Sequence, residues 1–350
     1  MVTRITLAIF FAASAVLAQQ QPPQYGEKVD VNLVLLDAVV TDARGNQILG
    51  LDKNDFVIKE NGVPQAIDSV DYFTNRRLLN SPESKAAFKV ERVHEQRYFI
   101  FFFDKPADTG MFFNRLALAR SAVKEFIRKE MKPSDVAAVV AHDVRLKVYS
   151  DFTSNREQLE RAVDETALFG RGITISDTVP DAPSILRGSA STLIDSTGTV
   201  YEALELLGER VRGIRARKEI VLFSLGIHEP GEEIRGGMIV TTSRYYEPMV
   251  RALNRSDVAV YPVSLLEDPN QPPYVHQALE RIASDTNGQY FRFNTSFSPA
   301  LRQVDKLSTG YYLIGYYTKP KNGAGYQKVN VAVKNPEFRV RARQGYSYGD

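Results

Sequence analysis

The fold of this chain is decided by residues 97–108, which read RYFIFFFDKPAD. Tyr98 to Phe103 is an unbroken apolar run that ends in Asp104, and a second acid, Asp108, follows four positions later. A strand that is apolar on both faces belongs in the middle of a sheet covered by helices. Carboxylates just past the end of such a strand lie where open α/β sheets bind ligands. The stretch therefore predicts the centre of an α/β sheet and a ligand-binding edge.

Strand and helix patterns alternate through the region that follows, and we predict one α/β domain over residues 97–308. This alternation is typical of a parallel sheet with helices on both faces. Further strands are predicted at 136–140, 146–149, 219–223, 258–263 and 289–293. Helices are predicted at 112–130, 154–168, 192–212, 242–254 and 274–284, the second of them capped by Thr153 or Ser154.

Both ends of the mature chain have β character. Residues 28–73 contain short alternating strands, among them 55–60 and its partner 63–73 across an Asn61-Gly62 turn. Residues 309–350 contain three more strands, at 311–317, 326–333 and 338–343. Neither segment is large enough to be stable alone, so we predict that the two pack together as a small β-sandwich. Separate packing of each segment on the α/β domain is the alternative. The charged residues 74–96, which lie between the first β segment and the α/β domain, are predicted to form a linker.

The first residues resemble a targeting signal. Arg4 precedes an apolar run from Ile5 to Leu17, and Val16-Leu17-Ala18 is a small-residue cleavage site. We expect a signal peptide at residues 1–18, then a disordered polar segment at 19–27; an uncleaved anchor is the alternative. Since no other segment reaches about 18 apolar residues, no membrane span is expected after cleavage, and the location is expected to be secreted or periplasmic.

Composition excludes several classes of function. The 44 basic and 42 acidic residues give a net charge of +2, which provides no electrostatic footprint for nucleic acid. The chain has no cysteine, so thiol catalysis and thiolate metal sites are excluded.

The order of these elements and several short motifs resemble a known family. The strand–acid–helix start, the later Ser224-Leu225-Gly226 and the strand Val-Tyr-Pro-Val at 260–263 are similar to a von Willebrand factor A domain. More narrowly, the chain resembles the VWFA-related secreted proteins of the Acidobacteria type. The segments that carry this resemblance are 39–45, 50–56, 60–65, 151–154, 311–317 and 341–346. The resemblance implies a von Willebrand factor A-like (Rossmann-like) sheet.

The resemblance also implies a metal-ion-dependent adhesion site at the carboxyl end of the sheet. Such a site offers oxygen ligands to Mg²⁺ from an Asp-x-Ser-x-Ser loop, a threonine and a further aspartate. In this chain Asp104 and Asp108 keep oxygen ligands in the first loop, whereas Pro106 replaces a serine and Lys105 adds a positive charge. Ser191 or Thr192 stands near the threonine position.

The third loop departs most from the family pattern. Leu225 stands where the aspartate is expected, and only Ser224 beside it offers an oxygen. We therefore predict a degenerate site with Asp104 and Asp108 as its metal-binding residues. No cofactor is expected; weak Mg²⁺ binding is the alternative. The ligand-binding rim is predicted to comprise Asp104, Asp108, Ser191, Thr192 and Ser224.

The sequence contains no convincing catalytic constellation. His142-Asp143 is predicted to lie at a solvated hairpin turn. Ser224 and His228 have the composition of a hydrolase pair but lack a nucleophile elbow. We therefore predict an exported, non-catalytic adhesion-type protein that binds a protein or a cell-envelope component. The alternatives are a structural scaffold of the envelope and a serine hydrolase that uses Ser224 and His228.

Overall fold

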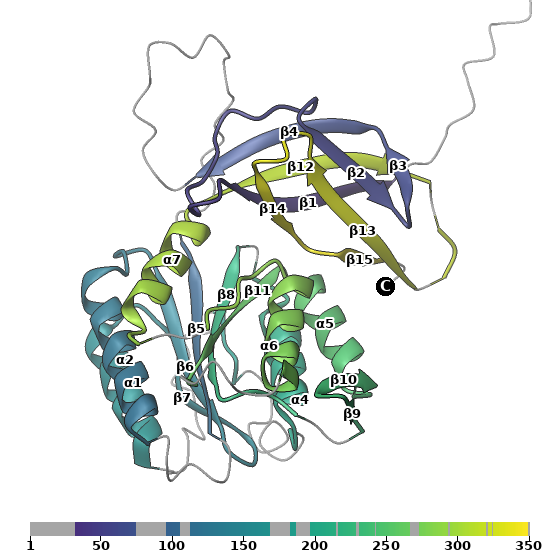
Figure 1. The fold of residues 1–350 in the computed structure, drawn as a ribbon. Helices are drawn as coiled ribbons and strands as arrows, with labels where there is room; N and C mark the ends of the chain where they lie inside the picture. Colours follow the sequence, from purple (N-terminus) through teal and green to yellow (C-terminus); the bar gives the residue numbers. More distant parts are fainter. Residues whose placement is uncertain are drawn as a thin grey trace, which may run out of the picture.

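The chain is described here by a computed structural model (Figure 1). The described residues are 32–74, 96–105, 113–168, 183–186, 197–214, 216–228, 231–241, 243–266, 273–292, 295–319, 321–323 and 325–348. The predicted signal peptide, the polar segment at 19–27 and nearly all of the predicted linker lie outside these residues. The boundaries proposed there therefore stay predictions. No helix within the described ranges is both long and apolar enough to cross a membrane.

A five-stranded sheet with β5 (Tyr98–Asp104) at its centre forms the core of the α/β domain. The strand order is β11-β8-β5-β6-β7, with β11 at Val258–Ser264, β8 at Lys218–Ser224, β6 at Val136–His142 and β7 at Leu146–Thr153. The predicted α/β class is confirmed. The sheet is mixed and not wholly parallel, because β7 runs antiparallel to β6, in agreement with the hairpin turn predicted at His142-Asp143. Only three residues join these two strands, and so short a connection can link antiparallel strands only.

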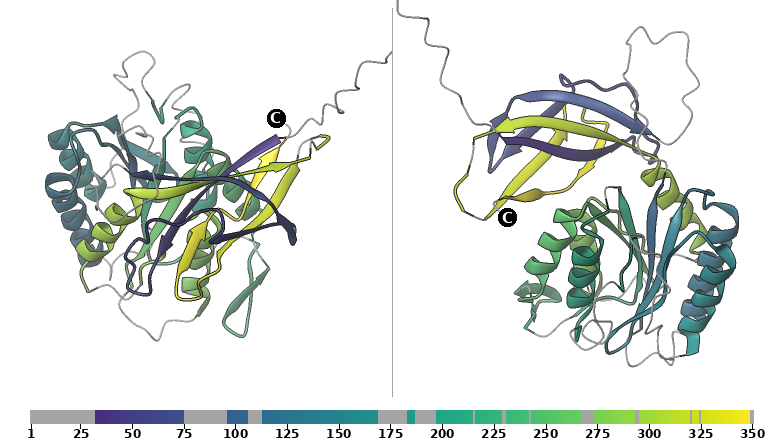
Figure 2. Two further views of the ribbon diagram at one scale, coloured as in Figure 1. Left: turned by 90° about the horizontal axis from the view of Figure 1, so that it is seen from above. Right: turned by 180° about the vertical axis from the view of Figure 1, so that it is seen from behind.

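Helices cover both faces of this sheet (Figure 2). The first face carries α1 (Phe113–Lys129), α2 (Arg156–Glu165) and α7 (Ser298–Ser308), with a 3₁₀ turn at Thr166–Leu168 after α2. The second face carries α4 (Val200–Val211), α5 (Tyr246–Arg255) and α6 (Pro273–Asp285). A small hairpin, β9 (Glu233–Arg235) and β10 (Met238–Thr241), was not predicted. The predicted final strand at 289–293 is reduced to one bridge between Phe291 and Val263.

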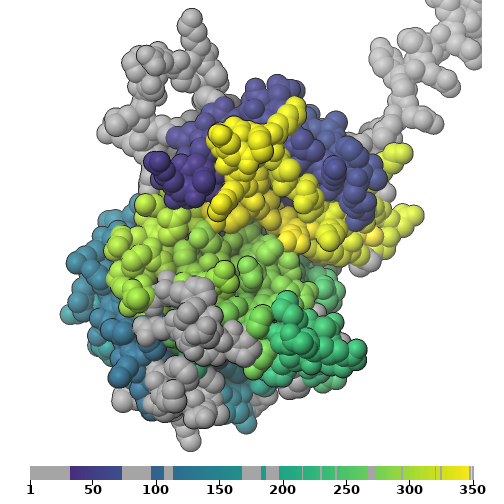
Figure 3. Space-filling model, in the orientation of Figure 1, coloured from purple at the N-terminus to yellow at the C-terminus, as the bar shows by residue number. Residues whose placement is uncertain are grey.

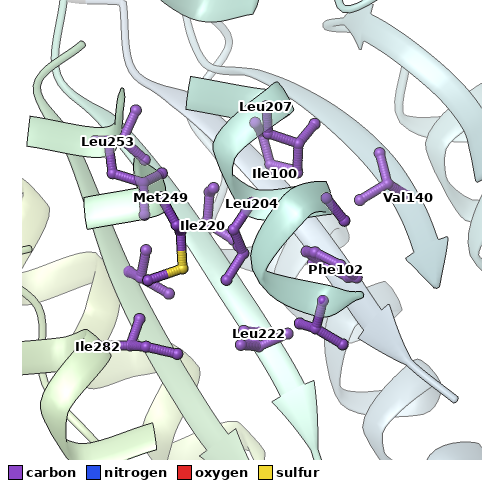
Figure 4. Packing of buried hydrophobic residues seen from close by; sticks show 14 of the residues in the cluster. Ile100, Phe102, Val140, Leu204, Leu207, Ile220, Leu222, Met249, Leu253 and Ile282 are labelled. Carbon is purple, nitrogen blue, oxygen red and sulfur yellow. The ribbon is translucent and has the colours of Figure 1, made fainter. Parts of the chain in front are cut away.

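Alternation along β5 explains why both faces can be covered. Phe99, Phe101 and Phe103 pack with α1, α2 and α7, whereas Ile100 and Phe102 pack under α4 and α5 (Figure 4). Successive strand residues point to opposite faces, so an unbroken apolar run supplies two cores at once. Every residue of β5 is buried.

The two ends of the chain form a β-sandwich together. One sheet has the order β14-β1-β12-β4, and the other has the order β15-β13-β2-β3. In the first sheet β1 pairs antiparallel with β12, with Leu36 opposite Ile314; in the second, β2 pairs with β13, with Ile58 opposite Val331. The strands are β1 (Asn32–Thr41), β2 (Phe56–Glu60), β3 (Val63–Gln65), β4 (Ile67–Thr74), β12 (Gly310–Thr318), β13 (Gly325–Val333), β14 (Arg339–Ala342) and β15 (Gly345–Tyr348).

Two details of the sandwich differ from the sequence prediction. Residues 63–73, predicted as one partner strand of 55–60, divide into β3 and β4, which belong to different sheets. The last predicted strand at 338–343 is followed by a further strand, β15, which pairs with β13. In both cases the chain changes sheets at the edge of the sandwich, and the hydrophobic pattern alone does not show such a change.

The β-sandwich packs on one end of the α/β domain (Figure 3), and the ribbon in Figure 1 shows that this end holds the amino ends of the parallel strands. The Asn287 side-chain amide donates to Asp37 Oδ2 at 2.8 Å, and the Arg343 guanidinium pairs with Asp257 at 2.8 Å. Asp257 immediately precedes β11, so these contacts lie where the strands begin. The carboxyl ends of β5, β6, β8 and β11, which we call the rim, therefore lie at the opposite end of the domain from the sandwich.

Candidate ligand-binding rim

Asp104 and Ser224 meet at the rim. They are the last residues of β5 and β8, which are adjacent parallel strands in register. The Ser224 hydroxyl donates to Asp104 Oδ2 at 2.5 Å, and both side chains are buried. The backbone N–H of Gly226 donates to the Ser224 hydroxyl oxygen at 3.1 Å. The structure thus brings together two of the predicted rim residues in one hydrogen-bonded unit.

Gly226 fixes the path of the chain beyond Ser224. Its φ is +120°, a conformation that side chains with a Cβ rarely adopt. A Cβ on Gly226 would also lie 2.7 Å from both the backbone oxygen and Cγ1 of Val275. The glycine of the Ser-Leu-Gly motif is therefore required by the turn that orients its N–H toward Ser224. Leu225 is half-buried and packs against the core on the α1 side of the sheet.

The sequence suggested that Lys105 places its positive charge beside Asp104. In the structure the Lys105 side chain lies instead against the ring of Tyr149. The Lys105 side chain is buried, and its Nζ lies 5.9 Å from the centroid of the Tyr149 ring on β7. Tyr149 belongs to the core on the α1 side of the sheet, whereas Asp104 follows Phe102 toward the other face. Burial lowers the pKa of the Lys105 ammonium to about 8, against the raising effect of Asp143.

His142 is buried at the rim, so the prediction of a solvated turn is wrong for this residue. It is the last residue of β6, opposite Asp104 in the sheet register, and only 5% of its surface is exposed. Its Nε2 lies 3.3 Å from the carbonyl oxygen of Thr197, and burial lowers its pKa, which favours the neutral ring. The strand predicted at 136–140 continues to residue 142 in β6. A longer strand prediction would have placed His142 inside the buried strand.

The other predicted rim residues cannot be placed. Asp108, Ser191 and Thr192, together with Pro106, lie outside the described residues. Their roles, including the metal-binding role of Asp108, stay predictions. Within the described ranges no group of three or more His, Cys, Asp or Glu side chains could hold a metal ion.

Among the described residues, the rim offers few oxygen ligands for a hard divalent cation. Asp104 offers a carboxylate and Ser224 a hydroxyl, and these two groups already bond to each other. Mg²⁺ requires near-octahedral oxygen coordination, which usually combines one or two carboxylates with several waters or ligand oxygens. Leu225 adds no oxygen from its side chain. Asp104 thus fits one ligand position, and the remaining protein ligands would have to come from residues beyond the described ones.

Ser224 and His228 do not form a catalytic pair in this structure. The Ser224 hydroxyl donates to a carboxylate, and no hydrogen bond joins it to His228 among the described residues. His228 is half-exposed, its Nδ1 lies 3.3 Å from Glu232 Oε2, and its ring packs edge-on to Tyr274. A serine nucleophile requires a base within hydrogen-bonding reach. The arrangement does not favour the hydrolase alternative.

Comparison with known proteins gives no family assignment from sequence. No protein-family profile matches the chain, and no curated protein matches it. Partial likenesses occur among solved structures. The PilB minor pilin of Streptococcus sanguinis aligns at a TM-score of 0.38 with 10% identity, over 60% of this chain and 59% of the pilin.

Two other structures give similar values. The vWF domain of the type V pili tip protein Mfa5 from Porphyromonas gingivalis has a TM-score of 0.40 and 11% identity, over 60% of this chain and 94% of that one. A conserved hypothetical protein, BatB, from Bacteroides thetaiotaomicron has a TM-score of 0.38 and 15% identity, over 60% and 98%. At these scores the likenesses do not by themselves fix a family.

Proposed function

We propose that this chain is an exported, von Willebrand factor A-like interaction protein that binds a protein or cell-envelope component at the rim. One observation carries the proposal. The sandwich packs on the amino ends of the parallel strands, and a polar Asp104–Ser224 unit lies at the opposite, carboxyl ends. Ligands of open α/β sheets bind at the carboxyl ends. The motif resemblance, with its predicted signal peptide, supports an extracytoplasmic location.

The proposed interaction is not catalytic and does not depend on a metal ion. The serine hydroxyl is directed at Asp104, and the position expected to supply a second acid holds Leu225. A buried polar pair of this kind organises the loops around it without requiring a cation.

Titration of the protein with Mg²⁺ and with Mn²⁺ in a calorimeter tests the metal-free form of the proposal. We expect no saturable heat at millimolar metal, and an Asp104→Asn variant should give the same trace as the natural chain. Saturable binding that the Asp104→Asn substitution removes would show a working metal site. It would restore metal-bridged adhesion as the mechanism.

A photo-crosslinking experiment tests whether the rim is the binding surface. A photoreactive amino acid replaces His228, which is half-exposed beside the rim, and the protein is irradiated with envelope extract. Leu118, half-exposed on the solvent-facing side of α1, is the matched control position. We expect a discrete adduct from position 228, unchanged by EDTA, and none from position 118.

The same experiment separates this proposal from the scaffold alternative. A third photoreactive position, Val63 on the edge strand β3, samples the sandwich and is well exposed. Adducts from position 63 with none from position 228 would favour assembly through the sandwich and contradict binding at the rim.

A further inference from the structure

A buried ion pair lies at the joint between the β-sandwich and the α/β domain. Glu219 is the second residue of β8, and its side chain is fully buried. Its Oε1 lies 3.5 Å from Nε of Arg217, the residue directly before the strand. Within the part of the chain that the structure describes, neither carboxylate oxygen of Glu219 accepts a hydrogen bond, and Nε and Nη1 of Arg217 donate none. The two groups are therefore paired in charge but poorly satisfied in hydrogen bonding.

Arg217 is enclosed by side chains from both sides of the joint. Its Nη2 donates to the Tyr261 hydroxyl on β11 at 3.3 Å, and its guanidinium carbon lies 5.6 Å from the ring centroid of Tyr311 on β12. Asp37 on β1 lines the same small hollow as Arg217. Tyr261 belongs to the α/β domain, whereas Tyr311 and Asp37 belong to the sandwich. The sandwich thus supplies one wall of the enclosure around the pair.

The apolar contact across the joint is small. Among the described residues of the sandwich, Val39 and Tyr311 alone pack into an apolar core of the α/β domain. Polar contacts supply the other links, as between Asp37 and Asn287. Relative motion of two packed units is the usual expectation unless their interface is large and hydrophobic. The joint therefore has the character of an interface that can open while each unit stays folded.

Other charged and titratable groups meet at this joint. Arg97, at the start of β5, pairs with Asp135 at 2.5 Å and with Asp305 on α7 at 2.7 Å, so its charge is already offset. Arg217 is the cation that directly faces Glu219. The remaining groups around the pair are Lys218, Asp37, Asp257, Tyr261, Tyr311, Arg341 and Arg343.

The acid is the member of the pair whose charge changes near neutral pH. Burial raises the pKa of the Glu219 carboxyl to about 7, against the lowering effect of Arg217. Burial alone would lower the pKa of Arg217, but Tyr261, Asp37 and Glu219 raise it, so the guanidinium stays charged. A buried charge needs hydrogen bonds as well as an opposite charge to offset its loss of water. Exposure to water therefore favours the ionised carboxylate.

We propose that the joint is a conformational switch that opens as pH rises, with the β-sandwich separating from the α/β domain and the Glu219 carboxylate reaching water. The sandwich keeps its own apolar core during this motion, as does the α/β domain. The rim lies at the other end of the α/β domain, so the switch stands or fails without the proposed function.

The direction of the switch follows from proton linkage. Glu219 titrates at about 7 when it is enclosed and at 4.5 when it is exposed to water. Between these pH values the closed joint holds a proton that the open joint releases. Closure is therefore favoured below pH 4.5 and is progressively weakened as pH rises through about 7. Lys218 acts in the opposite direction but at higher pH, because burial lowers its pKa to about 8.

Thiol labelling tests the proposal on the full chain, because the natural sequence has no cysteine. Val39→Cys places a single thiol at the joint, in a side-chain position that is 2% exposed. Its rate of reaction with iodoacetamide is divided by the rate of the urea-unfolded protein at the same pH, which removes the ionisation of the thiol itself. We expect this corrected rate to rise about tenfold or more from pH 5.5 to pH 7.5.

Two further single-thiol variants separate opening of the joint from unfolding of the chain. Leu36→Cys probes the core of the sandwich and Val123→Cys probes the core of the α/β domain, and both positions are fully buried. At pH 7.5 the corrected rate at position 39 should exceed the rates at positions 36 and 123 about tenfold or more. Equal rates at the three positions would show that the whole chain unfolds, and would overturn the proposal.

Variants of the ion pair test its control of the joint. Glu219→Gln keeps the size of the side chain without its charge, so it should abolish the rise at position 39. Glu209→Gln, at an exposed position of α4, is the matched control and should preserve the rise. Arg217→Met removes the cation that lowers the pKa of Glu219, so it should make the rise larger.

Two other results would contradict the switch. One is a corrected rate at position 39 that is the same at pH 5.5 and pH 7.5. The other is an undiminished rise in Glu219→Gln, or an unchanged rise in Arg217→Met, since a different group would then control the joint.

Discussion

At the scale of single residues, a buried hydrogen bond joins two strand ends at the rim. Ser224 and Asp104 are both nearly inaccessible, and Phe103 and Phe223 stack directly before them in the two strands, with ring centroids 5.3 Å apart. A carboxylate in such surroundings is stabilised by the hydroxyl that donates to it. The pair thus connects the apolar core to the polar rim.

Replacement of Ser224 by alanine should lower the free energy of unfolding by about 1–3 kcal/mol, because the buried Asp104 loses a donor. Urea denaturation followed by circular dichroism measures the change. Ser121→Ala, at an exposed position of α1, is the control and should stay within about 0.5 kcal/mol. An equally small effect at Ser224 would mean that Asp104 does not depend on this bond.

Glu219 is a second residue with a measurable signature. Its side chain is fully buried near the amino end of β8, and burial raises the pKa of its carboxyl from 4.5 to about 7, against the lowering effect of Arg217. Between these pH values the folded state keeps a proton that the unfolded state releases. The contribution of Glu219 to stability is therefore present below pH 4.5 and is lost as pH rises through about 7.

Glu219→Gln should consequently flatten the decline in the free energy of unfolding between pH 5 and pH 8. Urea midpoints at both pH values give this slope for the variant and the natural chain. Glu209→Gln, at an exposed position of α4, should leave the slope as it is. The assignment to Glu219 fails if its variant shows the natural slope.

At the scale of elements, α4 illustrates how a helix beside the rim is started. Thr199 caps it with a full capping box: the Thr199 hydroxyl accepts from the Glu202 N–H at 3.1 Å, and the Thr199 N–H donates to Glu202 Oε2 at 3.0 Å. Such reciprocal bonds satisfy two N–H groups that have no partner inside the helix. The helix then presents Leu204 and Leu207 to the core beneath it (Figure 4).

Thr199→Ala should destabilise the protein by about 1 kcal/mol, the usual cost of losing a cap. Thr199→Ser keeps the hydroxyl and should recover most of that loss, as thermal unfolding would show. If serine and alanine are equally destabilising, the methyl group of Thr199 matters and the cap does not.

At the scale of the whole molecule, the two ends of the chain depend on each other. β1 has β12 and β14 as neighbours, and β2 has β13, so every described strand from residues 32–62 pairs with a strand from residues 310–342. The polar contacts of Asp37 with Asn287 and of Arg343 with Asp257 then hold this sandwich on the α/β domain.

A chain that stops after Ser308 should therefore lose amide-exchange protection throughout residues 32–74. The strands β5, β6 and β8 should keep theirs, since their partners lie within the α/β domain. Hydrogen exchange read by mass spectrometry compares the two regions in one sample. Retained protection in residues 32–74 would show that the N-terminal strands are stable alone.

Much of the α/β domain could be predicted because its signals are local. The apolar run at Tyr98–Phe103 and the periodic apolar positions of α1 each identify their element without knowledge of its neighbours. The contact partner of His142 and the direction of Lys105 could not be predicted, because both depend on residues distant in sequence, Thr197 and Tyr149. The antiparallel direction of β7 agrees with the hairpin turn predicted at His142-Asp143, which is likewise a local signal.

RYFIFFFDKPAD by itself indicated that β5 is central and that an acid ends it, because so short an apolar run suits a strand buried on both faces. Only the tertiary structure decided what surrounds that acid: Ser224 from a strand 120 residues away donates to Asp104, and Lys105 turns to the opposite face. It also decided how the sandwich sits on the α/β domain, since Asp37 and Asn287 meet only after the two pack together. The physical reason is that burial and charge pairing are properties of neighbours in space, whereas hydrophobic period is a property of neighbours in sequence.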